Sequence, residues 1–175
     1  MTVARYAART TAFAAVYLLV SWVADVYLIL PPVVAAIWML AQGYWGLRRF
    51  DVIALVTVTV AAAVADGGSM LGGFALAVVI TAPALLFAVL VERWAPGWWQ
   101  GHGNRFRSQR VRLGRVAGAA AVSGIVFLVL FAVASGVPAL GLLGTPVVYA
   151  VTVLLGALAG RALKRPGRAG LTLVR

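Results

Sequence analysis

The chain alternates between long apolar segments and short polar ones. Runs of about twenty apolar residues, the length of a bilayer-spanning helix, are separated by turns rich in glycine, proline or arginine. The pattern predicts an all-α, polytopic integral membrane bundle of about six transmembrane helices, because only helices satisfy the backbone in lipid at this length. The expected spans cover residues 9–30, 33–47, 52–65, 71–91, 116–134 and 140–163.

Basic residues interrupt this apolar pattern at alternate turns. The 15 Lys and Arg residues lie near the N-terminus, at 48–49, in a central loop at 92–115 and at the C-terminal end, which includes a basic tail at 164–175. The turns near residues 31, 67 and 137 hold none. Because cytoplasmic loops carry the excess of Lys and Arg, the alternation predicts six spans in the inner membrane rather than five or seven, with both termini cytoplasmic.

The N-terminal apolar run begins like a signal peptide, with Arg5 and Arg9 before it. It continues to Leu30, however, and the bulky Trp22 and Tyr27 do not suit a small-residue cleavage site. We therefore expect a retained first span.

Composition narrows the function classes. The chain is 63% hydrophobic and 11% charged, with a net charge of +11. Its basic residues are divided among separate turns, whereas a nucleic-acid-binding module gathers them on one soluble domain, so we expect no nucleic-acid partner. With no cysteine, one histidine and four acidic residues, the chain is poorly equipped for a metal site or a hydrolytic triad. We expect no enzyme activity, no metal and no cofactor.

Asp25 is the acidic residue that lies within an apolar run rather than at the end of one. Tyr17, Ser21 and Asp25 recur every four residues, so they share one face of a helix. A charged group at this depth costs a few kcal/mol unless it faces protein or water. The spacing predicts an outward-facing polar site, with Asp66 from the next outer turn. The alternative is that Asp25 is the hydrated end of a shorter helix and that Asp66 belongs to an ordinary Asp-Gly turn.

The remaining polar residues have simpler interpretations. Asp51 would begin the third span, where a carboxylate suits the helix dipole. Glu92 would form a solvated pair with Arg93, and Gln42 and Thr59 would be packing groups between helices.

The central loop is a candidate contact for anionic lipid, and its alternative role is topological charge alone. Trp98 and Trp99 lie after Arg93 and before the other arginines of the loop, and they are expected at the level of the lipid headgroups. The candidate lipid contacts are Arg105, Arg107, Arg110 and Arg112.

Gly156 and Gly160 form a G-x-x-x-G pair on the last span. Such pairs let helix backbones approach closely. They predict close packing within the protein, with a dimer interface as the alternative.

The whole chain resembles the MreD-type rod-shape-determining proteins, which are small six-span membrane proteins with cytoplasmic ends. The resemblance lies in Pro31-Pro32, in Asp66, and in the Leu71-Gly72 pair after the turn. The chain departs from the family pattern at Val33, where that family usually has Asp after Pro, and at Val64-Ala65. The resemblance implies a scaffold for the cell-wall elongation machinery.

Three other stretches resemble the first type of membrane-associated sensor (MASE) domain. These are GLRRFDVIAL at 46–55, PALLFAVLVERW at 83–94 and LGTPVV at 143–148. That family normally has more spans and an attached output domain, so the match is partial. It implies a sensory input.

Three functions remain open from the sequence. The first is a non-enzymatic scaffold that holds other membrane proteins, the second is a sensory or small-ligand-binding unit, and the third is the substrate-binding subunit of a small transporter. All three have the lipid bilayer as a partner. An acid within a span and an outward pocket favour the second and third functions.

Overall fold

The computed structural model describes residues 3–23, 30–42, 48–99, 109–136 and 144–163. These residues form six α-helices and no strand, which confirms the all-α prediction for this part of the chain. The helices are α1 (Val3–Val23), α2 (Leu30–Gln42), α3 (Arg48–Ala65), α4 (Met70–Trp94), α5 (Gln109–Ser135) and α6 (Thr145–Leu163). Within the described ranges, α1, α4, α5 and α6 are the helices long and apolar enough to cross a membrane.

Several helix ends differ from the expected spans. Pro31 and Pro32 lie in the first turn of α2 rather than in a connecting turn. Proline is tolerated there, because the first amide groups of a helix have no carbonyl partner within it. The first helix begins at Val3, well before the expected start at residue 9.

The expected loop at 92–115 is helical at both ends. Helix α4 continues to Trp94, and α5 begins at Gln109. Arg110 and Arg112 therefore lie on a helix rather than in a loop. Arginine is a good helix former, and its long side chain can extend from a helix into water.

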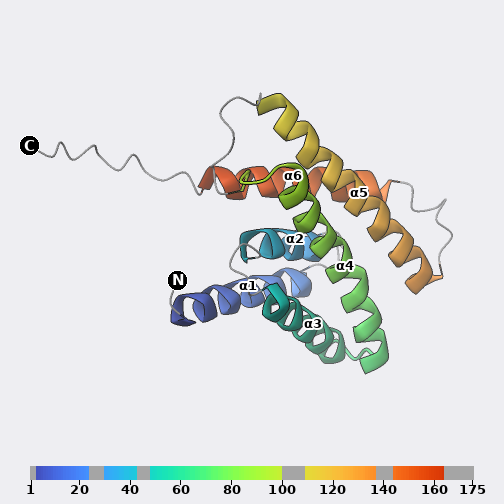
Figure 1. Ribbon diagram of the computed structural model, residues 1–175. Coiled ribbons are helices and arrows are strands. Elements are labelled where there is room, and N and C mark those ends of the chain that lie inside the picture. Colours follow the sequence, from blue (N-terminus) through green and yellow to red (C-terminus); the bar gives the residue numbers. More distant parts are fainter. Residues whose placement is uncertain (1–2, 24–29, 43–47, 100–108, 137–143, 164–175) are drawn as a thin grey trace, which may run out of the picture.

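Helix α4 is the centre of the arrangement. It packs against α2, α3 and α5, while α6 packs against α5 and α2. Figure 1 shows α4 and α5 as a long antiparallel pair that α6 crosses. Helix α1 lies at the edge, against α2 and α3, and Tyr17 is its one fully buried residue among those described.

Side-chain contacts gather six helix ends on one side of the molecule, which we call the basic end. Arg48, at the start of α3, forms an ion pair with Glu92, near the end of α4. Arg115 of α5 donates a hydrogen bond to the Trp94 carbonyl oxygen over 2.8 Å. Glu92 therefore pairs across two helices, and the expected pairing with Arg93 is wrong.

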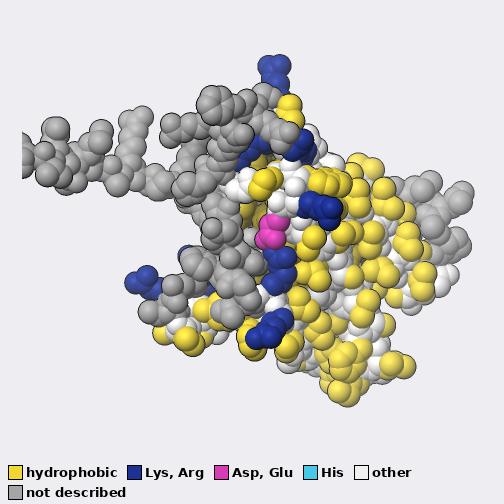
Figure 2. Space-filling view, viewed as in Figure 1, with side chains coloured by type: hydrophobic (Ala, Val, Ile, Leu, Met, Phe, Trp, Pro, Cys, Tyr) yellow, Lys and Arg dark blue, Asp and Glu magenta, His cyan; other side chains and the backbone are white. Residues whose placement is uncertain are grey.

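The remaining three helices reach the same end. The guanidinium of Arg161, near the end of α6, lies 4.9 Å from the ring centre of Trp98. Polar contacts that join the start of α1 and the end of α2 to Asp51 of α3 are described below. Figure 2 shows the Lys and Arg side chains as a broken band, with an acidic side chain among them and hydrophobic side chains to one side.

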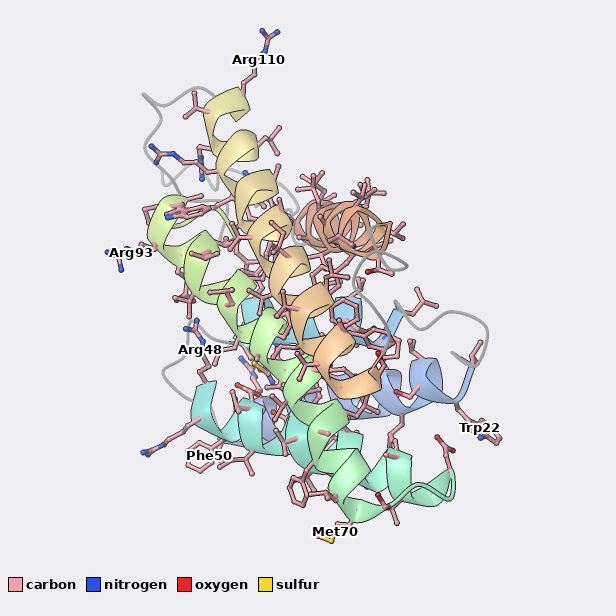
Figure 3. All side chains as sticks on the ribbon, turned by 90° about the vertical axis from the view of Figure 1, so that its right-hand side faces the viewer. Trp22, Arg48, Phe50, Met70, Arg93 and Arg110 are labelled. Carbon is pink, nitrogen blue, oxygen red and sulfur yellow. The ribbon has the colours of Figure 1, made fainter. Side chains whose placement is uncertain are left out.

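The opposite end carries no basic residue in the part that the structure describes. We call it the pocket end. It includes the end of α3, the start of α4 and the turn between them. Figure 3 shows Arg48, Arg93 and Arg110 well away from Met70, which begins α4, and shows Trp22 projecting away from the helices.

Two tryptophans have a different place from the one expected. Trp98 and Trp99 are only 1% and 5% exposed, so they pack inside the protein rather than on its surface. Trp99 meets α6 at Gly160, where an added Cβ atom would lie 2.9 Å from the indole ring. Close packing of a bulky ring therefore depends on glycine at this position.

Candidate functional site

A pocket of about 230 Å³ lies at the pocket end, and three residues of the expected site line it: Tyr17, Ser21 and Asp66. Tyr17 and Ser21 come from α1, whereas Asp66 directly follows α3. Residues that are more than forty positions apart therefore border one hollow. Asp25, the fourth member of the expected site, lies outside the described residues.

The polar side of this pocket is held in place by α1 and α3. Tyr17 is buried, and its hydroxyl group and that of Thr59 hydrogen bond each other over 3.0 Å. The Thr59 hydroxyl also donates to the carbonyl oxygen of Leu55 over 2.8 Å. Ser21 lies one helical turn beyond Tyr17 on the same face and is partly exposed, so its hydroxyl is accessible from the pocket.

Asp66 is exposed at the mouth of the pocket. The turn that carries it closes through Gly67, which has a φ of 82°, a conformation that glycine adopts without steric cost. Asp66 is the one charged residue among the described residues that line the pocket. The electrostatic character of the opening is therefore negative.

The other side of the pocket is apolar and aromatic. Phe127 and Phe131 of α5 line it, with their ring centres 5.9 Å apart. Phe127 also stacks on Tyr149 of α6, at 5.0 Å. This ladder of rings makes a firm apolar wall opposite the hydroxyl groups and the carboxylate.

A second cleft, of about 550 Å³, adjoins the first between α1 and the end of α3. Ser21 and Asp66 line both hollows. A hydroxyl and a carboxylate that border two hollows can contact a ligand from either one. The two residues are therefore the centre of the candidate site.

The other sequence candidates are not part of this site. Arg105 and Arg107 lie outside the described residues, and Arg110 and Arg112 are at the basic end, on α5. A Cβ atom at Gly156 would meet Ile37 of α2 at 2.8 Å. Gly156 and Gly160 thus serve contacts within the chain. The described residues hold no group of three or more metal-ligating His, Cys, Asp or Glu side chains.

A second polar cluster, at the basic end, was not expected from the sequence. It surrounds Asp51, which is 0% exposed. Its Oδ1 atom accepts hydrogen bonds from Trp38 Nε1 and Gln42 Nε2, each over 3.1 Å, and a longer one from the Thr10 hydroxyl over 3.5 Å. The Gln42 amide also donates to the Thr10 hydroxyl over 2.9 Å.

This cluster joins three helices without a basic partner. The described residues show Arg48 paired with Glu92 and no ion pair at Asp51. A buried carboxylate is costly unless its environment compensates it, and hydrogen bonds to a charged group contribute about 1.5–3 kcal/mol each. The donors from α2 therefore stabilise Asp51 and hold the end of α2 to the start of α3.

A weak signal of this cluster was present in the sequence. Trp38 and Gln42 are four residues apart, as are Tyr6 and Thr10, so each pair shares one face of its helix. The sequence predicts Gln42 as a packing group and Asp51 as the start of the third span. In the structure α3 begins at Arg48, and Asp51 lies in its first turn. What the spacing does not reveal is that both faces turn toward the same carboxylate.

Comparison with known protein families finds none that matches this chain, and neither the curated proteins nor the solved structures include a match. The class of protein therefore rests on the fold and the two polar sites themselves.

Proposed function

We propose that this chain is a non-enzymatic, multi-pass protein of the inner membrane that binds a small ligand in the pocket between α1, α3 and α5. The basic end faces the cytoplasm and the pocket opens on the outer side. The observation that carries the proposal is the convergence of Tyr17, Ser21 and Asp66 on one hollow. Such a unit serves either as a sensory input or as the substrate-binding subunit of a transporter.

The topology is supported by where the basic residues meet. The contacts of Arg48, Arg115 and Arg161 all lie at the basic end. This supports a topology in which each helix runs once between the two ends and the arginines remain on one side, as the positive-inside rule requires. The apolar lengths of α1, α4, α5 and α6 fit passage through a bilayer.

The lining of the pocket indicates the chemistry of its ligand. Asp66 provides a negative charge, Ser21 provides a hydroxyl that donates and accepts, and Phe127 and Phe131 provide aromatic faces. Aromatic faces and carboxylates both attract cations. The ligand class is a small organic cation, such as an amine or a quaternary ammonium compound, with an apolar portion.

A thermal-stability assay on the protein purified in mild detergent tests this proposal. Small ammonium compounds are compared with neutral compounds of the same size and shape, because a ligand that binds the folded state raises the melting temperature. We expect the cations to stabilise the unmodified protein and to lose this effect in the Asp66→Asn variant. Glu92→Gln is the control, because it removes an acidic group at the basic end. If cations and neutral compounds act alike, the ligand class is wrong.

The second candidate is an assembly component like the MreD-type proteins, and the exposed side of α1 favours it. Leu19 and Trp22 are 62% and 80% exposed, on a helix at the edge of the bundle. Photo-crosslinking in intact membranes from position 19 should then capture a protein partner. Position 147 on α6, where Val147 is 63% exposed, is the matched control. Crosslinks to lipid alone from both positions would count against a scaffold.

A further inference from the structure

A third hollow, of about 400 Å³, lies at the basic end between α1 and α2 and reaches Trp99 and Gly160. Its walls are almost wholly apolar. Ala12, Phe13 and Val16 line it from α1, and Val34, Ile37 and Ala41 line it from α2. Its volume falls within the range of small-molecule sites, which are typically about 300–1,000 Å³ and mostly apolar with a few polar groups.

The polar groups of this cleft lie at one end. Arg9 and Gln42 line it, and Gln42 is hydrogen bonded to Thr10, the neighbour of Arg9. From Arg9 to Val16 the wall formed by α1 changes from charged to apolar over about 10 Å, at 1.5 Å per residue. The cleft is therefore polar at the end that belongs to the cytoplasmic side and apolar toward the middle of the bundle.

Gln42 lines the cleft and, within the part of the chain that the structure describes, holds an unpaired hydrogen-bond acceptor. Its side chain is 1% exposed, and its amide nitrogen donates to Thr10 and Asp51. Its Oε1 atom is buried and has no hydrogen-bond partner among the described residues. A ligand that matches this end carries a negative charge for Arg9 and a donor for Gln42 Oε1.

The walls of the cleft are fixed by contacts outside it. The ring of Phe13 stacks on Trp38, with ring centres 5.8 Å apart, and the Asp51 cluster joins the starts of α1 and α3 to the end of α2. Trp99 is held against α6 at Gly160. A cleft with braced walls is preorganised for a ligand, which lowers the ordering cost of binding.

We infer that this cleft binds one acyl chain of an anionic phospholipid, with the lipid phosphate at Arg9 and a head-group hydroxyl donating to Gln42 Oε1. The cleft lies at the level of the cytoplasmic leaflet, where anionic lipids attract basic residues. The inference rests on the proposed orientation but not on the ligand of the outer pocket. It places lipid recognition between α1 and α2, a different position from the arginines of residues 105–112.

Native mass spectrometry of the full chain in mild detergent tests the inference, with phosphatidylglycerol and phosphatidylcholine of the same acyl chains as probes. We expect the unmodified protein to retain one phosphatidylglycerol molecule more tightly than phosphatidylcholine. A basic residue near the membrane surface contributes roughly 1 kcal/mol, so Arg9→Gln should weaken phosphatidylglycerol binding about five-fold. Arg5→Gln, an exposed arginine on the same helix that does not line the cleft, should change it less than about two-fold.

A second pair of variants tests the apolar part of the cleft. Ala12→Phe places a ring in the cleft and should reduce retention of both lipids. Ala7 is exposed on another face of α1, so Ala7→Phe should leave the retention of both lipids unchanged. All four substituted positions are exposed, so the variants should fold, and their circular dichroism checks this. Equal retention of the two lipids by the unmodified protein would overturn the inference. So would equal effects of Arg9→Gln and Arg5→Gln, or retention unchanged by Ala12→Phe.

Discussion

Replacing Gly124 with alanine tests how closely α5 and α6 pack. Gly124 is buried on α5, and a Cβ atom built there would lie 2.7 Å from the carbonyl oxygen of Pro146 on α6. The obstacle is backbone, so it cannot rotate away as a side chain can. Gly114, nearly three turns earlier on the same helix, has open space around the same atom, with nothing within 4 Å.

The expected magnitudes come from two opposing effects. Alanine is favoured over glycine inside a helix by about 0.8–1.0 kcal/mol. Overpacking a tight contact costs about 1–3 kcal/mol. Gly114→Ala shows the first effect alone and should raise the free energy of unfolding by up to about 1 kcal/mol. Gly124→Ala combines both, so the two variants should differ by about 1–3 kcal/mol, with Gly124→Ala the less stable.

The assay is reversible unfolding in mixed micelles, in which the fraction of a denaturing detergent is raised while helix content and tryptophan fluorescence are followed. Gly118→Ala provides a second comparison, since its Cβ atom would lie 3.6 Å from the Trp94 ring, an ordinary contact distance that carries no overpacking cost. Gly114→Ala and Gly118→Ala should be similarly stable, and Gly124→Ala should be the least stable of the three. Should Gly124→Ala prove as stable as Gly114→Ala, the close approach of α5 to α6 is refuted.

Three further predictions concern topology and the basic end. Reporter fusions at Gly67 and Gly103 should report opposite sides of the membrane, and the same side for both would refute the six-span prediction. Asp51→Asn keeps an acceptor for the donors from α2 and should be tolerated. Asp51→Leu leaves the buried donors of Trp38 and Gln42 without an acceptor, which should cost about 1–3 kcal/mol each in the free energy of unfolding. Equal unfolding free energies for the two variants would contradict this. A double-mutant cycle between Arg48→Gln and Glu92→Gln should give a coupling below about 1 kcal/mol, because the pair is partly exposed, and a much larger coupling would show that it is screened from water.

The sequence was informative about the helices and less so about which of their faces meet. Apolar runs and turn residues predicted an all-α chain, because these signals are local. The burial of Trp98 and Trp99 was not predictable in this way, because it depends on Gly160 and Arg161, some sixty residues later. Helix starts were misplaced where a polar residue, such as Arg48, extends a helix beyond its apolar part.

The two candidate sites differ in how far the sequence predicts them, because one depends on spacing within a helix and the other on contacts between helices. Spacing on one helix groups Tyr17 with Ser21, and Asp66 is predicted to join them because it lies in the next outer turn. Asp51 looked like an ordinary helix start, since its burial depends on Gln42 and Trp38 of the preceding helix. Spacing shows which residues share a face of one helix. It does not show which face of a neighbouring helix packs against them.

Helix α1 contributes residues to both polar sites. It buries little apolar surface within the protein, and in a bilayer apolar burial gives little drive for helices to associate, so packing and polar contacts must hold it. Those contacts lie at both ends: Thr10 reaches Asp51 and Gln42 at the basic end, and Tyr17 reaches Thr59 near the pocket. Between them α1 forms one wall of the lipid cleft. A ligand that competes for the hydroxyl groups of Tyr17 or Ser21 therefore acts on the helix that depends most on polar contacts for its position.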